Sequence, residues 1–273
     1  MNNKISLAGD LGSGKSTVSK ILIERLGAEY YSTGTAVRSV AERMGMSVVE
    51  LNHYMESHPE IDEEIDNGLR ELANDPRSLI IDSRMAWHFT KGTFPVYLSV
   101  DAESAAVRIM CANRTGEHSD SVEATVRETR ERRASEKLRY SERYGVDITD
   151  LSNYALVVDT TYATPDEIAE AIITAFDKWQ KDKSYRALYV SPERLYYPDD
   201  APDELLLEEL TSALECGEDI PEVLVFESDG EFYIESGAES ALARSFSMQT
   251  FIPARLVTSS AKGRSYVKMK NSL

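Results

Sequence analysis

Eight residues near the N-terminus have the types and the spacing that hold a nucleotide phosphate. They run from Gly9 to Ser16 in the pattern Gly-x-x-x-x-Gly-Lys-Ser. An apolar run, residues 5–8, precedes them, and a helix-like pattern, residues 15–26, follows them. A strand that enters a glycine-rich turn and leaves as a helix points backbone N–H groups into one concavity, where the helix N-terminus adds positive partial charge. The pattern predicts a phosphate-binding loop but does not distinguish a kinase from an ATPase or a GTPase.

The loop also assigns chemistry to single side chains. Lys15 is expected to reach the β and γ phosphates, and Ser16 to bind the Mg²⁺ that bridges them. The alternative, a glycine-rich turn without a ligand, is less consistent with the strand, loop and helix occurring together. The residues expected to surround the phosphates are Gly9, Gly12, Ser13, Gly14, Lys15, Ser16 and Thr17.

Two later motifs supply further groups that suit phosphates and a metal. Arg38 follows Ser32-Thr33-Gly34 in the first turn of an expected helix, and its guanidinium suits a second phosphate. Asp82 ends an apolar strand and is the candidate for the outer shell of the Mg²⁺, and Arg84 is a second clamp on an acceptor phosphate. The purely structural alternatives are that Arg38 is a solvated residue of a capped helix and that Asp82 is the polar end of a buried strand.

An acidic helix between these motifs carries two candidate base-binding carboxylates. Ile61, Ile65 and Leu69 recur every four residues, which places Asp62 and Asp66 together on an adjacent face. A solvated charged face explains most of these acids. A carboxylate here could still accept hydrogen bonds from the exocyclic amine of a bound base.

A later helix is rich in arginine. Arg132, Glu136 and Arg139 share one face at spacings of four and three, with Arg143 one turn further on. Such a face could close over a nucleotide and bring positive charge to a migrating phosphoryl group, whereas opposite charges at this spacing would also support a merely solvated helix. The arginines of this helix are Arg127, Arg130, Arg132, Arg133, Arg139 and Arg143.

Alternating strands and helices are expected to position these groups. Such alternation predicts an α/β fold, with a parallel sheet covered by helices on both faces. Ligands in such sheets bind beyond the carboxyl ends of the strands, where each motif above falls. The expected strands are 5–8, 29–31, 79–81, 95–100 and 154–158, and the expected helices are 15–26, 35–44, 48–56, 61–73, 102–113, 122–144 and 165–181.

Together these motifs resemble the cytidylate kinase-like family of P-loop nucleoside monophosphate kinases, over nearly all of residues 1–175. The resemblance implies that Lys15 and Ser16 bind MgATP and that Arg38 and Arg84 grip the acceptor phosphate. It also implies that Arg132 and Arg139 stabilise the transferring group and that Arg108 or Arg114 lines the adenine side. Departures from the family pattern are Asp10, Leu11 and Ser83, and they leave the acceptor open. The residues that carry the resemblance are Gly9 to Thr17, Ser32 to Gly34 with Arg38, Pro59 to Asp62 with Ile65 and Asp66, Asp82 to Arg84 with Ala86 and Trp87, and Arg132 to Asp147.

Composition excludes several other classes. The 273 residues carry a net charge of −17, which argues against a nucleic-acid or anionic-membrane partner. Cys111 and Cys216 have no metal spacing, which supports neither a zinc site nor a disulfide framework. The N-terminus shows no signal-like apolar segment and no run approaches a membrane span, so a cytoplasmic location is expected.

A composition change near residues 180–187 predicts a domain boundary. We expect a kinase-like domain over 1–180 and a small α+β domain over 187–273. The second part loosely resembles the ParB/sulfiredoxin-like fold, with a hairpin around Asp229-Gly230. Active members carry a Gly-His-x-Arg element where this chain has Gly237-Ala238-Glu239-Ser240, so the resemblance implies a non-catalytic module that binds a protein partner.

The functional hypothesis is a phosphotransferase that moves the γ-phosphoryl group of MgATP to a nucleoside monophosphate, with CMP or dCMP favoured by the resemblance. One alternative is a kinase of another small acceptor. The other is a non-catalytic ATP sensor that reports nucleotide occupancy to a partner.

Overall fold

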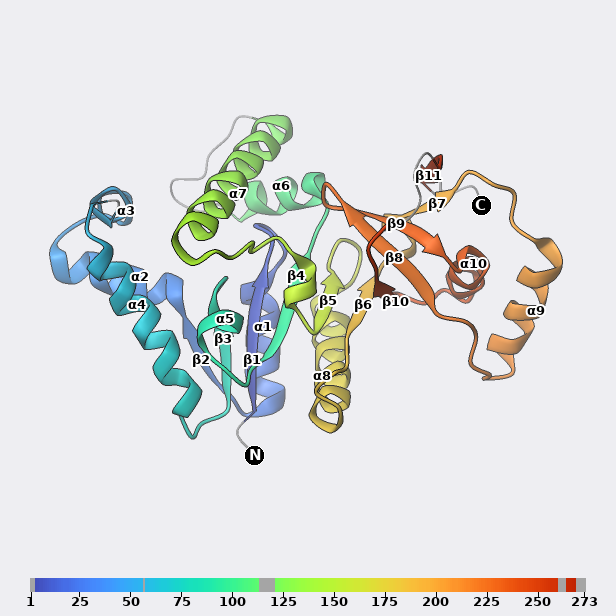
Figure 1. Ribbon diagram of the computed structural model, residues 1–273, viewed down its shortest axis with the longest axis horizontal. Helices are drawn as coiled ribbons and strands as arrows, with labels where there is room; N and C mark the ends of the chain where they lie inside the picture. Colours follow the sequence, from blue (N-terminus) through green and yellow to red (C-terminus); the bar gives the residue numbers. More distant parts are fainter. Residues whose placement is uncertain (1–2, 56, 113–120, 260–263, 269–273) are drawn as a thin grey trace.

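One mixed sheet runs through the whole protein (Figure 1). The computed structural model describes residues 3–55, 57–112, 121–259 and 264–268. Its strand order is β11-β7-β9-β8-β10-β6-β5-β4-β1-β3-β2. The five N-terminal strands pair in parallel, and they are β1 (Lys4–Gly9), β2 (Glu29–Ser32), β3 (Leu79–Asp82), β4 (Phe94–Ser99) and β5 (Leu156–Asp159).

Helices cover both faces of this parallel part, as expected from the alternating pattern. On one face α1 (Lys15–Leu26) and α8 (Pro165–Lys181) pack together over a core that includes Leu22, Phe94 and Phe176. The other face is covered by the short α5 (Ala86–Phe89), which packs with the end of α4 (Pro59–Glu71). The predicted α/β architecture is confirmed, whereas α5 was not predicted.

The remaining helices of this part surround the carboxyl ends of the strands, where a ligand would enter (Figure 1). One group, drawn in blue to cyan, lies beyond β2, and a second group lies above β1 and β4. The first group contains α2 (Thr33–Met44), α3 (Val48–Met55) and α4, and the second contains α6 (Ala102–Cys111) and α7 (Val122–Tyr144).

The C-terminal part extends the same sheet. Its first strand pairs in parallel with β5 and antiparallel with β10, so hydrogen bonds cross the predicted boundary near residue 187. The predicted hairpin turn is confirmed, because Asp229 and Gly230 have φ values of 55° and 84°, which suit a tight hairpin turn. The elements are β6 (Ala187–Val190), β7 (Leu195–Pro198), α9 (Glu204–Glu215), β8 (Val223–Ser228), β9 (Glu231–Ser236), α10 (Ala238–Phe246), β10 (Ile252–Leu256) and β11 (Tyr266–Lys268).

Apolar side chains of this part form a core that is continuous with the first. Leu188, Val225 and Phe232 join Tyr97 and Tyr154 in one buried cluster, which α10 covers. The sheet is not interrupted at the predicted boundary. The division into two domains that fold separately therefore remains a prediction. Within the described residues no helix is both long enough and apolar enough to cross a membrane.

Candidate active site

The phosphate loop between β1 and α1 follows a path that two of its residues can adopt only as glycine. Gly12 has a φ of 78°, and a Cβ added there would lie 2.7 Å from the Ala105 carbonyl oxygen of α6. A Cβ on Gly9, with a φ of 149°, would overlap the Leu98 carbonyl oxygen of β4. Glycine accepts these backbone angles without steric penalty. The loop is therefore held against β4 and α6 at the distance that its glycines allow.

Lys15 lies at the centre of the site. Its Nζ donates to the carbonyl oxygens of Gly9 and Asp10, both at 2.9 Å, so the amine is folded over the start of the loop. Burial lowers the pKa of Lys15 to about 8, against the raising effect of the Asp82 carboxylate, while the nearby charge of Arg84 lowers it further. Lys15, Asp82 and Arg84, which the sequence places far apart, therefore lie close enough for their charges to affect one another.

Tyr30 lies close to both Asp82 and Arg38. The Tyr30 hydroxyl donates to Asp82 Oδ2 at 2.9 Å. Burial and the neighbouring Asp82 raise the pKa of Tyr30 to about 12, whereas the charge of Arg38 opposes that rise. Arg38 is exposed and donates to Thr35 Oγ1 at 3.0 Å. Its guanidinium is therefore open to an incoming phosphate.

Ser16 and Asp82 offer the donor types that suit Mg²⁺. The ion prefers oxygen ligands and is commonly held by one or two carboxylates together with substrate phosphates. Ser16 is exposed at the start of α1, and Asp82 is half-buried at the end of β3. In the described part of the chain, no three His, Cys, Asp or Glu side chains gather into a closed metal cage. The residues present fit an ion that arrives with the nucleotide.

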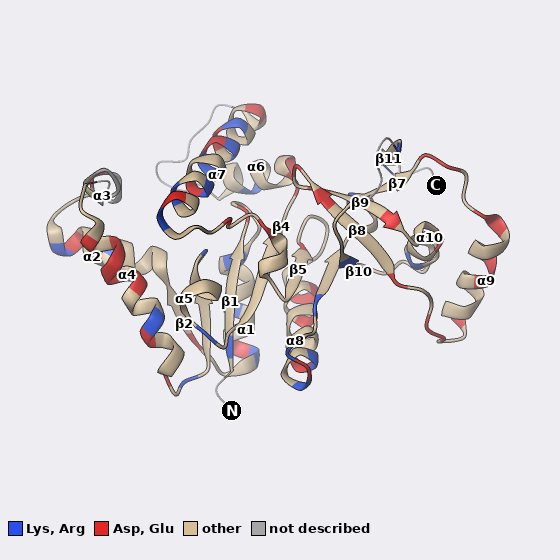
Figure 2. Ribbon diagram, in the orientation of Figure 1, with Lys and Arg blue, Asp and Glu red and all other residues tan. Residues whose placement is uncertain are grey.

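Glu136 connects α7 to the segment that follows the end of β3. Its Oε1 lies 2.9 Å from Arg84 Nη1 and 3.2 Å from Arg132 Nε. Arg139, one turn further, lies with its guanidinium 5.2 Å from the Tyr140 ring centroid. Figure 2 shows that acidic and basic residues are interspersed along α7. The structure thus brings Arg84 and Arg132 together through a shared acid, which sequence reasoning had treated only as part of a helix face.

Asp62 and Asp66 face the end of the same helix. Asp62 Oδ2 lies 2.6 Å from Arg143 Nη1, and Asp66 Oδ2 accepts from the Tyr144 hydroxyl at 2.6 Å. Burial raises the pKa of Asp66, against the hydrogen bond from Tyr144. Both proposed base-binding carboxylates are therefore occupied by donors from the last turn of α7. These contacts connect α4 to α7.

Asp10 is paired with an arginine that had no predicted role. Its Oδ1 accepts from the Tyr97 hydroxyl at 2.6 Å and lies 2.8 Å from Arg133 Nη1, and Oδ2 accepts from the Val100 backbone N–H at 3.2 Å. The carboxylate is thus turned toward β4 and α7. These residues line a cavity of about 680 Å³ between the loop, α7 and the turn that joins β8 to β9. In the sequence, the indication of this arrangement is the acidic residue Asp10 within the phosphate loop.

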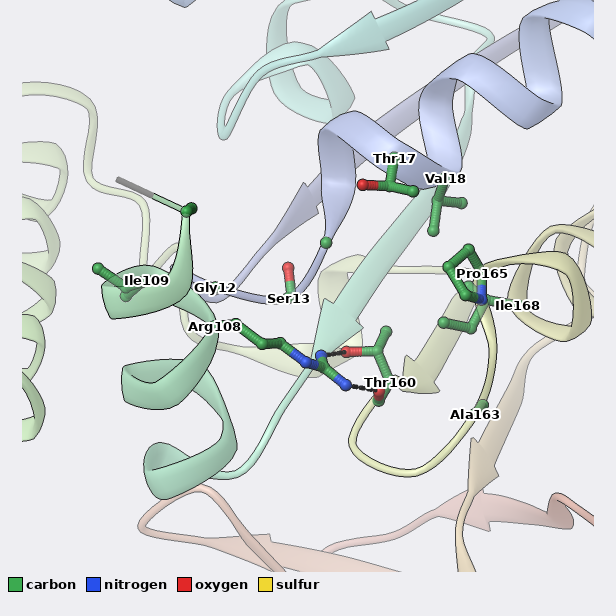
Figure 3. A pocket seen from close by; sticks show the side chains of 12 residues that line it. Gly12, Ser13, Thr17, Val18, Arg108, Ile109, Thr160, Ala163, Pro165 and Ile168 are labelled. Atoms are coloured by element: carbon green, nitrogen blue, oxygen red, sulfur yellow. Dashed lines mark hydrogen bonds between the residues drawn. The ribbon is translucent and has the colours of Figure 1, made fainter. Parts of the chain in front are cut away.

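A second cavity of about 330 Å³ lies on the other side of the loop (Figure 3). Arg108 of α6 crosses it and donates to the Thr160 and Thr161 carbonyl oxygens at 2.7 and 2.9 Å. Arg114, the other residue expected on the adenine side, lies outside the described residues. The lining is mostly apolar, as a flat base requires, and consists of Gly12, Ser13, Gly14, Thr17, Val18, Arg108, Ile109, Ala112, Thr160, Ala163, Pro165 and Ile168.

Comparison with known proteins identifies relatives for the first two thirds of the chain. A cytidylate kinase of Thermoplasma volcanium is 36% identical over 186 residues, which cover 67% of this chain and 95% of the relative. A cytidylate kinase of Halobacterium salinarum is 33% identical over 180 residues, covering 66% and 92%. An S-adenosylmethionine-dependent nucleotide dehydratase of Lacinutrix mariniflava is 40% identical over 179 residues, which are 65% of this chain but only 37% of that protein.

Fold and family comparisons agree with these relatives. The crystal structure of an uncharacterized protein from Eubacterium ventriosum superposes with a TM-score of 0.51 at 17% identity, covering 64% of this chain and 99% of that one, which shows a shared fold. The model of the cytidylate kinase-like family matches residues 4–162, more than half of the chain. The match contains the phosphate loop, both strand-end motifs and the arginine-rich helix. The chain therefore belongs to the cytidylate kinase-like family.

Proposed function

We propose that the protein transfers the γ-phosphoryl group of ATP to a nucleoside monophosphate, with CMP or dCMP as the favoured acceptor. The observation that carries this proposal is the position of Lys15, whose Nζ lies over the start of a glycine-fixed phosphate loop, beside the strand end where Asp82 is in register with Leu7 of β1. Relatives named as cytidylate kinases support the choice of acceptor.

The chain's residues would act by position and charge. The loop N–H groups and Lys15 hold the triphosphate, while Arg38 and Arg84 hold the acceptor phosphate in line with the γ-phosphorus. An acceptor phosphate oxygen forms the new P–O bond as the bond from the γ-phosphorus to the β–γ bridging oxygen breaks, and ADP leaves with the electron pair. Arg132 and Arg139 stabilise the charge on the transferring group. Ser16 and Asp82 would hold Mg²⁺, which neutralises phosphate charge when bound.

A kinase of a different acceptor is the second candidate. Asp62 and Asp66 are engaged with Arg143 and Tyr144, so base recognition through these acids would require α7 to release them. The match with the relative named as a nucleotide dehydratase covers only 37% of that protein. A similar segment therefore occurs in a protein whose name describes nucleotide chemistry other than CMP phosphorylation. A non-catalytic ATP sensor is the third candidate, and its signature is ATP binding without transfer.

For residues 187–273 we propose a role without phosphoryl transfer. The predicted ParB/sulfiredoxin-like relationship would place nucleotide chemistry at the start of α10. Gly237 there has a φ of 84°, and Ala238 and Glu239 follow it, so the position offers an acid instead of a cation to a phosphate. We propose that this part serves the kinase part or a protein partner.

A single assay tests the proposed function. The purified chain is incubated with MgATP and each of the ribo- and deoxyribonucleoside monophosphates, and the formation of ADP and of each diphosphate is measured. We expect turnover with CMP or dCMP, and its loss in Lys15→Met, which controls for contaminating kinases. ATP binding without turnover on any acceptor would favour the sensor, and turnover only on an unrelated acceptor would favour the second candidate.

A further inference from the structure

Arg194, which lies outside the family match, has a fully buried side chain. It belongs to a short turn between β6 and β7, and it has no exposed surface. Nη1 lies 3.0 Å from Glu231 Oε2, and Nη2 donates to the Gly230 carbonyl oxygen at 2.9 Å. Gly230 lies in the turn between β8 and β9, and Glu231 is the first residue of β9. A charged group is rarely buried completely unless it is paired, so this arginine needs a specific partner on its inner side.

That inner partner is Asp159, the last residue of β5. Arg194 Nε lies 3.5 Å from Asp159 Oδ1, and Nε has no hydrogen-bond partner among the described residues. Asp159 is also fully buried, and its Oδ2 accepts from the Ser191 backbone N–H at 3.2 Å. The C-terminal part therefore supplies both an N–H donor and a full positive charge to a carboxylate at the end of a strand in the family segment.

Asp159 fixes the loop that follows it. Its Oδ1 accepts from the Thr161 hydroxyl at 2.6 Å and from the Thr161 backbone N–H at 3.2 Å. The Thr161 Oγ1 in turn accepts from the Asp101 backbone N–H at 3.1 Å, and Asp101 caps the N-terminus of α6. One buried carboxylate thus holds the loop after β5 and, through Thr161, the start of the helix that carries Arg108.

These two elements form walls of the cavity beside the phosphate loop. Thr160 and Ala163 line it from the loop after β5, Pro165 lines it from the start of α8, and Arg108 lines it from α6 (Figure 3). The guanidinium of Arg108 is fixed by the Thr160 and Thr161 carbonyl oxygens. A displacement of Thr161 would therefore move both walls, whereas the start of the glycine loop is held by the close contact of Gly9 with Leu98 of β4, which does not involve Thr161.

We propose that Arg194 is a positioning residue for the nucleotide base: by neutralising Asp159 it fixes the loop after β5 and Arg108, so residues beyond the family segment complete the base side of the ATP site. This inference rests on the proposed function, because it takes the cavity to hold the base of ATP. Without the guanidinium, Asp159 would be buried without a cation, and the loop would shift to bring it to water.

The test compares MgATP with Mg-tripolyphosphate, which occupies the phosphate loop but has no base. Dissociation constants of both are measured by calorimetry for the full chain and for Arg194→Lys, which keeps a positive charge but cannot serve Asp159 and the hairpin turn together. We expect the constant for MgATP to rise roughly 2- to 30-fold and the constant for tripolyphosphate to stay unchanged. A general loss of structure would weaken both ligands alike and would overturn the proposal, as would an unchanged preference for MgATP.

Two further variants keep the test decisive. Glu231→Gln removes the ion-pair partner of Arg194 Nη1, so the guanidinium is held less firmly beside Asp159. This variant replaces Arg194→Lys in the same comparison if Arg194→Lys does not fold, and a smaller loss of MgATP preference is expected. Arg255→Ala breaks an exposed pair with Glu222 in the same part of the chain and should change neither constant. If the wild-type chain bound neither ligand, the proposed function itself would be overturned. If the wild-type chain bound both ligands and the Arg194 and Glu231 variants had the same dissociation constants, only the role of Arg194 would be overturned.

Discussion

The two sides of the candidate cleft are built in different ways. On the ATP side, the phosphate loop is fixed by backbone contacts of Gly9 and Gly12 with β4 and α6. On the acceptor side, side chains pair across long sequence separations, as in Asp62 with Arg143 and Arg84 with Glu136. Backbone packing of this kind does not change when a ligand arrives, whereas ion pairs can exchange one partner for a phosphate. We infer that the ATP side is prearranged and that the acceptor side rearranges on binding.

The strongest test of the prearranged side is Gly12→Ala. The new Cβ would lie 2.7 Å from the Ala105 carbonyl oxygen, so the loop must move away from α6. We expect MgATP affinity to fall by about 100-fold, because small displacements of phosphate-binding groups have large effects. Gly217→Ala is the matched control, since Gly217 has a φ of 77° but no atom within 4 Å of the added Cβ. Equal losses of affinity in the two variants would show that a general loss of stability, and not the close approach of Gly12 to α6, is responsible.

On the acceptor side, Arg84→Gln tests the proposed phosphate clamp. Loss of a guanidinium bonded to a phosphate should raise the acceptor KM about 10- to 100-fold, with MgATP binding little changed. Arg25→Gln is the control, because Arg25 is likewise ion-paired, with Asp166 and Glu170, and its side chain is 35% exposed, against 27% for Arg84. Steady-state kinetics with each substrate varied in turn separates the two KM values, and a rise confined to ATP would refute the assignment.

The pKa of Lys15 predicts a pH effect confined to the ATP side. Burial lowers this pKa to about 8, and a bound triphosphate favours the protonated amine, so affinity is full below pH 8 and declines above it. The dissociation constant of MgATP should rise up to about tenfold per pH unit above 8. Calorimetry from pH 6.5 to about 9.5 measures the slope. The same series with Lys15→Met should be flat, and a slope that persists in that variant would assign the titration to another group.

The smallest expected effect tests whether the acceptor phosphate replaces Glu136 as the partner of Arg84 and Arg132. Glu136 holds Arg84 and Arg132 and would compete with the acceptor phosphate for them. Glu136→Gln should therefore lower the acceptor KM by about twofold to fivefold, because partly exposed ion pairs are weak. Glu64→Gln, which removes the exposed pair with Arg43, should leave KM unchanged. A raised KM in Glu136→Gln would mean that Glu136 orients the arginines and does not compete for them.

Elements with a strong local pattern were predicted well, and those stabilised by distant pairing were not. The helix over Lys15–Leu26 and the hairpin at Asp229-Gly230 carry their signals in adjacent residues. In contrast, β7 (Leu195–Pro198) is four residues long, ends in proline and is stabilised by β9 and β11 on either side. Its sequence reads as a loop because its partners lie elsewhere in the chain.

The sequence by itself determined the phosphate loop, because glycine spacing, Lys15 and the following helix are local and their geometry follows from the backbone. It also supplied the set of arginines on α7. Only the tertiary structure decided that Arg133 meets Asp10, that Glu136 joins Arg84 to Arg132, and that Arg194 is buried against Asp159. Charges spaced along a helix look alike in sequence, and their partners are chosen by how the sheet brings distant segments together.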